Sequence, residues 1–150
     1  MKEQLVRNWM TPDPITISPS TTLPQAQQIM MEKNIRRLPV VWDGKLVGIL
    51  TFGDIREAKP SEANTLSVYE LNYLLDRLTV KAIMTSNPIT VDPDATIGQA
   101  ANIMLEKKIG GIPVVENGRL VGIITETDLC RLIVAEGPNF IKNAAKEKQE

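Results

Sequence analysis

The chain has 150 residues, a formal net charge of −1 and 43% hydrophobic residues. This composition is typical of one globular domain, and the balanced charge gives no indication of binding to nucleic acid or to an anionic membrane. There is no histidine and only one cysteine, which excludes the usual general base, imidazole metal ligands and an internal disulfide. Without a bilayer-length apolar run or a signal-peptide core, the sequence predicts a cytoplasmic protein that is not an enzyme.

The sequence contains two copies of one unit. Residues 6–55 align with residues 80–129 without a gap, so that Asp128 lies 74 positions after Asp54. Two copies are too few for a solenoid, and a single copy would bury too small a fraction of its surface. We therefore expect the copies to pack about a pseudo-two-fold axis, which would create two related clefts.

Each copy begins with a short extended segment between prolines, residues 15–17 in the first copy and 89–91 in the second. A helix follows. Its start is predicted at Thr22 or Thr96, because each threonine stands three residues before a glutamine, the spacing of a capping box. Apolar residues then recur at helical spacing, which predicts a buried face for this helix.

Two hydrophobic strands come next in each copy, separated by Asp43-Gly44 or by Asn117-Gly118. These pairs favour a type I′ hairpin turn, which needs a positive φ at both central residues. A final helix is predicted to begin near Asp54 or Asp128. The expected fold class is therefore α/β (α+β), with two β-α-β-β-α repeats.

The segment between the copies is predicted to be a polar loop over residues 57–65, followed by a helix that begins at Ser67. The buried face of this helix is expected to comprise Leu71, Leu74, Leu75 and Leu78. Cys130 is expected to be a small buried hydrophobic residue. The predicted domains are 1–56 for the first repeat, 57–79 for the linker with its helix, 80–137 for the second repeat, and 138–150 for a flexible tail or short exposed helix.

The side chains best suited to chemistry stand where the last strand of each copy meets the final helix. They are Thr51 with Asp54, and Thr125 with Asp128. Phosphate would be favoured by the free N–H groups at such a junction, and the aspartate can accept both hydroxyls of a ribose. The same spacing is also a capping-box pattern. It therefore leaves capping and ligand binding open, and both can hold for the same residues.

Three segments with their second copies, Trp9–Ile17, Arg36–Val41 and Gly48–Asp54, resemble tandem CBS domains. Over residues 6–135 the pair resembles a Bateman module of the small stand-alone bacterial or archaeal type. The resemblance implies a non-enzymatic regulatory module that binds AMP, ADP or ATP in clefts between the repeats and signals to a partner protein. It also implies a homodimer with no required cofactor, apart from Mg²⁺ that can accompany ATP, and no contact with nucleic acid or membrane.

In such modules the aspartate holds the ribose and the threonine contacts phosphate, which assigns one cleft to Asp54 and the other to Asp128. The resemblance implies that apolar residues of the opposite repeat hold the adenine. These residues are Ile89, Thr90 and Ile109 for the Asp54 cleft, and Ile15, Thr16 and Ile35 for the Asp128 cleft. The implied ligand-binding set also contains Thr51, Thr125, Ile49, Ile123, Arg36, Arg37, Gly110 and Gly111.

The two clefts are not expected to be equivalent, because the first copy has Arg36-Arg37 where the second has Gly110-Gly111. Arginine offers a fork of donors that suits phosphate, whereas glycine offers only close approach of the backbone. Glu126 would repel a polyphosphate if its side chain pointed inward. We therefore predict the stronger anion site at Asp54, with Arg36 able to reach toward the second cleft. The alternative is a solvated arginine pair on a strand edge.

Two further functions remain open at this point. One is binding of S-adenosylmethionine, whose sulfonium would prefer a cleft without the arginine pair. The other is a ligand-free structural or dimerisation module, in which the threonine and aspartate only cap helices.

Overall fold

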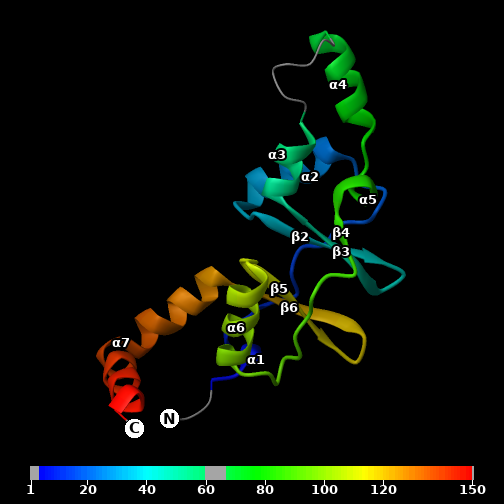
Figure 1. Cartoon of the computed structure of the whole chain (residues 1–150). Coiled ribbons are helices and arrows are strands. Elements are labelled where there is room, and N and C mark those ends of the chain that lie inside the picture. The colour runs from blue at the N-terminus through cyan, green and yellow to red at the C-terminus, as the bar shows by residue number, and fades with distance from the viewer. Residues whose placement is uncertain (1–3, 60–66, 150) are drawn as a thin grey trace. The chain divides into compact units, whose positions relative to one another are not determined.

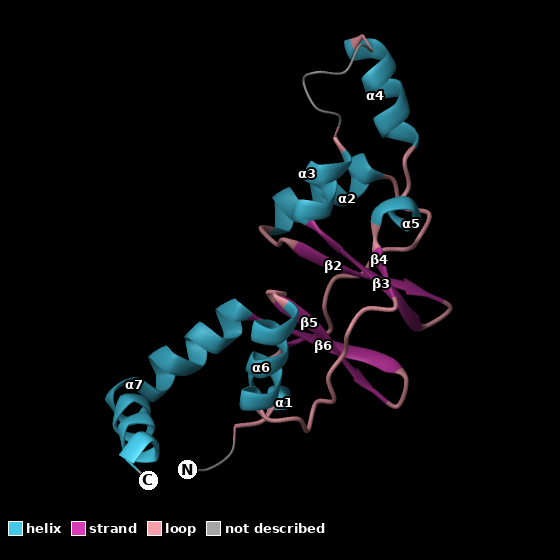
Figure 2. Cartoon of the chain, viewed as in Figure 1, coloured by secondary structure: helices cyan, strands magenta, loops and turns pink. Residues whose placement is uncertain are grey.

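The computed structural model describes residues 4–59 and 67–149 (Figure 1). The chain forms two compact units, one of residues Pro14–Pro88 and the other of Met1–Asp13 together with Ile89–Glu150. These units differ from the sequence repeats, since the segment that opens each repeat belongs to the unit of the other repeat. Each unit contains a three-stranded antiparallel sheet with helices (Figure 2). The expected mixed α/β fold is confirmed.

The unit of residues 14–88 has the strand order β2-β3-β4. Its elements are α2 (Leu23–Lys33), β2 (Arg37–Trp42), β3 (Lys45–Thr51), α3 (Phe52–Ala58), α4 (Val68–Arg77), α5 (Val80–Ile83) and β4 (Thr85–Ser86). The core of this unit comprises Ile17, Ala26, Met30, Leu38, Val40, Leu50, Ile55 and Val80.

The second unit has the strand order β1-β6-β5. Its elements are α1 (Val6–Trp9), β1 (Thr11–Pro12), α6 (Ile97–Lys107), β5 (Gly111–Glu116), β6 (Arg119–Thr125) and α7 (Glu126–Gln149). Its core comprises Val6, Val91, Ile97, Ala100, Met104, Ile112, Val114, Ile124 and Leu132. Most of these residues stand 74 positions from a core residue of the first unit, so the repeat in the sequence specifies a repeated core.

The local predictions for helix starts and hairpins are confirmed. Thr22 and Thr96 each form a reciprocal capping box with the glutamine three residues later, and Ser67 forms one with Glu70. Both residues of each hairpin turn have positive φ, 51° and 74° at Asp43-Gly44 and 52° and 79° at Asn117-Gly118.

The predicted first strand of each copy is wrong in extent. Residues 15–17 and 89–91 each contribute only one parallel bridge, Ile17 with Val40 and Val91 with Val114. The prolines that flank these segments lack the N–H needed for a longer ladder. The third strand of each sheet comes instead from β1, which pairs with β6, and from β4, which pairs with β3.

The burial prediction for the linker helix is only partly correct, since Leu71, Leu75 and Leu78 are half-buried, and the burial prediction for the cysteine is wrong. No residue of α4 is fully buried, and Leu74 is 51% exposed. Among the described elements, α4 packs mainly against α2. Cys130 is exposed on α7. Most of the predicted loop over 57–65 lies outside the described residues.

The segment after residue 137 is helical to Gln149, in line with the exposed helix that the sequence left open. It is set off from the first part of α7 by Gly137, whose φ of 52° and ψ of −133° are not helical, and by Pro138. Within the described part of the chain, no helix has the length and apolar character needed to cross a membrane.

Candidate ligand-binding site

The first Thr-x-x-Asp motif lies where β3 passes into α3. The backbone N–H of Thr51 donates to Asp54 Oδ2 at 2.8 Å, and the N–H of Asp54 donates to Thr51 Oγ1 at 3.1 Å. This is a complete capping box, so the capping interpretation is correct for this copy. Among residues 4–59 and 67–149, no hydrogen bond engages the other carboxylate oxygen of Asp54.

The arginine pair stands beside this motif. Arg37 is the direct partner of Thr51 across the β2–β3 ladder, and the N–H of Phe52 donates to the carbonyl of Arg36 at 2.8 Å. Neither arginine forms an ion pair with another described residue. The backbone of Arg36 and Arg37 thus lies next to the strand-to-helix junction that carries Thr51 and Asp54.

The second motif has the same backbone but different side-chain contacts. The N–H and the hydroxyl of Thr125 both donate to Asp128 Oδ2, at 2.8 and 3.2 Å. Arg131 Nη1 donates to Asp128 Oδ1 at 3.0 Å, as an i,i+3 ion pair on α7. Asp128 is 2% exposed and is the only buried charged side chain in the described ranges.

Glycines take the place of the arginines in this unit. Gly111 is the partner of Thr125 across the β5–β6 ladder, and the N–H of Glu126 donates to the carbonyl of Gly110 at 3.0 Å. The side chain of Glu126 is exposed. The backbone around the two motifs is therefore alike, and the difference between them is one of side-chain charge.

Each set of predicted adenine-contacting residues lies in the same unit as the aspartate of its own repeat. Ile15, Thr16 and Ile35 belong to the unit that contains Asp54, and Ile89, Thr90 and Ile109 belong to the unit that contains Asp128. Ile15 and Ile89 are 39% and 40% exposed, which is unusual for isoleucine. Their assignment to the aspartate of the opposite repeat stays a prediction.

The other predicted apolar residues pack against the cores or pair across the hairpins. Ile35 and Ile109 pack against the cores of their own units. Ile49 and Ile123 face Pro39 and Pro113 across their hairpins, and Ile123 is only 8% exposed.

The sequence analysis missed Arg131. The spacing of an acidic residue and a basic residue three positions later on one helix is a recognisable pattern for an ion pair.

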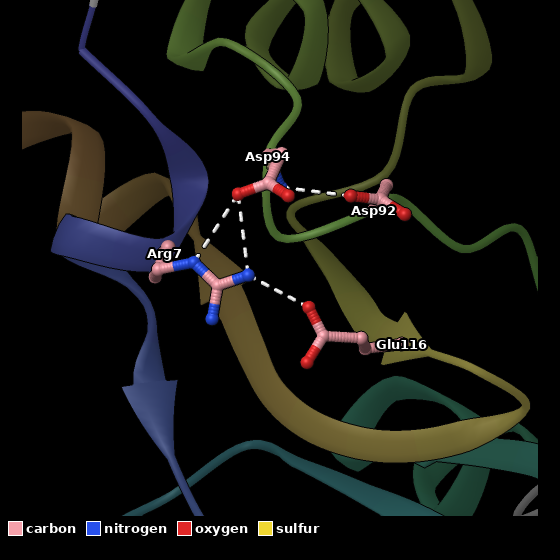
Figure 3. A network of polar contacts seen from close by, with 4 residues as sticks. All are labelled: Arg7, Asp92, Asp94 and Glu116. Carbon is pink, nitrogen blue, oxygen red and sulfur yellow. Dashed lines mark hydrogen bonds and ion pairs between the residues drawn. The ribbon is translucent and has the colours of Figure 1, made fainter.

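A second polar network was also missed, and it holds α1 on its unit (Figure 3). Arg7 donates to Glu116 Oε2 at 2.7 Å and twice to Asp94 Oδ1 at 3.2 Å. These hydrogen bonds, that to Glu116 first, raise the pKa of the Arg7 guanidinium above its usual value. The partners lie 87 and 109 positions away in the sequence, so no local pattern indicates them.

No group of three or more metal-ligating side chains occurs among the residues that the structure covers.

The family model for the CBS domain matches this chain twice, over residues 6–61 and 80–135. The chain belongs to the CBS domain family. A CBS domain-containing protein of Dictyostelium discoideum is 36% identical over 132 residues, which cover 87% of this chain and 91% of that protein. Inosine-5′-monophosphate dehydrogenase of Korarchaeum cryptofilum is 39% identical over 118 residues, 78% of this CBS protein but only 22% of the enzyme.

Two solved structures of CBS proteins are similar to this chain over nearly their whole length. The CBS domain pair of protein MJ0100, in complex with 5′-methylthioadenosine and S-adenosyl-L-methionine, has a TM-score of 0.75 and 33% identity, covering 90% of this chain and 99% of that chain. CBSX2 in complex with AMP has a TM-score of 0.73 and 29% identity, covering 88% and 97%. Adenosyl compounds are thus the ligands of both of these similar proteins.

Proposed function

We propose that this CBS pair is a non-enzymatic sensor of AMP, ADP or ATP, which it binds through its Thr-x-x-Asp motifs. The observation that carries the proposal is the grouping of Arg36, Arg37, Thr51 and Asp54 at one strand-to-helix junction. A carboxylate can accept both hydroxyls of a ribose, and arginines present forked donors to phosphate. The AMP complex of the similar protein CBSX2 supports this choice of ligand.

The capping contacts are compatible with this role. Asp54 uses one carboxylate oxygen to cap α3, and an ionised carboxylate has about four acceptor positions. The capping bonds fix the rotamers of Thr51 and Asp54 before a ligand arrives. Such preorganisation lowers the entropic cost of binding.

We propose further that bound nucleotide shifts the population of conformations of a homodimer and that a separate partner protein detects the change. A ligand can shift such an equilibrium only by as much as its affinities for the two states differ.

A second candidate ligand is S-adenosylmethionine at the motif of Asp128. Gly110 and Gly111 leave no cationic side chain at the place of the arginine pair, so the positive sulfonium would meet less repulsion there. The MJ0100 complex with S-adenosyl-L-methionine supports this alternative.

The test is a thermal-shift panel with AMP, ADP, ATP, S-adenosylmethionine and NAD. A ligand that binds only the folded protein, at 100 times its Kd, adds about 2.7 kcal/mol to the free energy of unfolding, which raises the midpoint by several degrees. The shift should disappear in Asp54→Ala, Asp128→Ala or the double variant, depending on the motif used. No shift with any of the five would favour the ligand-free dimerisation module.

A further inference from the structure

Asp54 and Asp128 occupy equivalent positions, yet among residues 4–59 and 67–149 only Asp128 is paired with a cation. Asp128 Oδ1 accepts from Arg131 at 3.0 Å, and its side chain is 2% exposed. The residue equivalent to Arg131 in the first repeat is Glu57, which stands 74 positions earlier. A glutamate cannot donate to Asp54 and would repel it, so this ion pair is restricted to the second repeat.

The backbone does not account for the difference. In both repeats the threonine N–H donates to the aspartate Oδ2 at the same distance, 2.8 Å. In the second repeat, however, the threonine hydroxyl also donates to Oδ2, whereas in the first repeat Thr51 Oγ1 accepts from the N–H of Asp54. Both oxygens of Asp128 are therefore engaged by side chains, whereas the described residues engage only one oxygen of Asp54, through a backbone N–H.

We propose that Arg131 is a positioning residue. Its ion pair with Asp128 occupies the carboxylate and so competes with the ribose hydroxyls of an adenosyl ligand. The inference rests on the proposed function, since it concerns the same motif. Thr125 and Arg131 together use three of the roughly four acceptor positions of Asp128. A ribose diol needs two positions, so binding must exchange the guanidinium for the ligand. Removal of Arg131 should therefore tighten binding at Asp128 and leave Asp54 unaffected.

Replacing the Arg131–Asp128 ion pair by contacts with a ligand is expected to change the binding affinity only modestly. The side chain of Arg131 is 66% exposed, and partly exposed ion pairs of this kind change an equilibrium by no more than about fivefold. The second motif is then a weaker site that fills after the first as the nucleotide concentration rises.

The experiment is calorimetric titration of AMP into the full chain, with one motif disabled at a time. In the Asp54→Ala background, Arg131→Gln should tighten AMP binding by up to about fivefold, and Arg131→Lys should keep the weaker affinity. In the Asp128→Ala background, Arg131→Gln should change nothing. Glu57→Gln in the Asp54→Ala background is the matched control, because it neutralises a charge at the equivalent position of the other repeat.

Weaker AMP binding in Arg131→Gln would overturn the inference, because it would show that the guanidinium contacts the ligand. An unchanged affinity, or a Glu57→Gln effect of equal size, would also overturn it. If Asp54→Ala alone abolishes binding, recovery in the Arg131→Gln double variant supports the competition, and failure to recover rejects it. Failure of the proposed function looks different, since the unmodified chain would then bind none of the adenosyl ligands in the thermal-shift panel.

Discussion

In the unit of residues 14–88, two cations stand beside the Thr-x-x-Asp motif, whereas in the other unit glycines hold their places and the cation Arg131 follows the aspartate. The equivalents of Arg7, Asp94 and Glu116 in the first unit are Lys81, Ser20 and Trp42, which cannot form the same network. The cores, by contrast, are made of equivalent apolar residues. The repeat therefore preserves the apolar packing of the two cores, whereas the charged residues differ between the two motifs.

The largest expected effect is a loss of stability on truncating a core residue, and it shows whether the two cores are equivalent. Leu50 and Ile124 occupy the same position of the repeat and are both fully buried. Leu50→Ala and Ile124→Ala should each lower the free energy of unfolding by about 2–5 kcal/mol, through lost burial and the cavity that remains. Urea unfolding measures both, with Leu105→Ala as a control, because Leu105 is 78% exposed. A near-neutral result at only one of the two core sites would contradict equal packing.

The next effect concerns the close approach of the third strand to each hairpin. A Cβ at Gly48 would lie 3.0 Å from the carbonyl oxygen of Thr85, and one at Gly122 would lie 2.9 Å from that of Thr11. Gly48→Ala and Gly122→Ala should therefore each cost about 1–3 kcal/mol of stability.

The control for these glycines is Gly98→Ala in α6, where the nearest atom would be 3.8 Å away. This change should be neutral or stabilising by up to about 1 kcal/mol. Equal behaviour of all three glycine variants in urea unfolding would show that the strand crossing is not tightly packed.

The next effect is expected from the arginine pair that only the first repeat carries. Arg37→Ala should weaken ATP binding by about 10- to 100-fold, since hydrogen bonds to charged groups contribute about 1.5–3 kcal/mol. Lys45→Ala removes the same charge at the hairpin end of the sheet and should have little effect. Calorimetric titration that finds the Arg37→Ala affinity within about threefold of the unmodified chain would reject a phosphate role for Arg37.

The smallest effect is expected at the Arg7 network. Arg7→Gln should lower the thermal midpoint by at most about 4 °C, because exposed ion pairs contribute little. Lys81→Gln at the equivalent position should not change it. The difference between the two variants should vanish in 1 M salt, where the Debye length is about 3 Å. A difference that persists at high salt would mean that Arg7 acts through packing.

Much of the fold and part of the site could be predicted from the sequence. The hairpin turns and the capping residues were correct because each depends on contacts within about four residues. The placement of Arg36 and Arg37 beside Thr51 follows from the hairpin register. The ion pair between Arg131 and Asp128 could have been predicted in the same way, from its i,i+3 spacing.

The sequence by itself determined the repeat, the capped helix starts, the hairpin turns and the apolar face of the helix that follows each threonine cap. The tertiary structure decided which strand completes each sheet, the exposure of Cys130 and of Leu74 on α4, and the burial of Asp128. The physical reason is the range of the interactions. Caps and turns depend on neighbours along the chain, whereas burial and strand pairing depend on segments that are distant in sequence and that only the folded chain brings together.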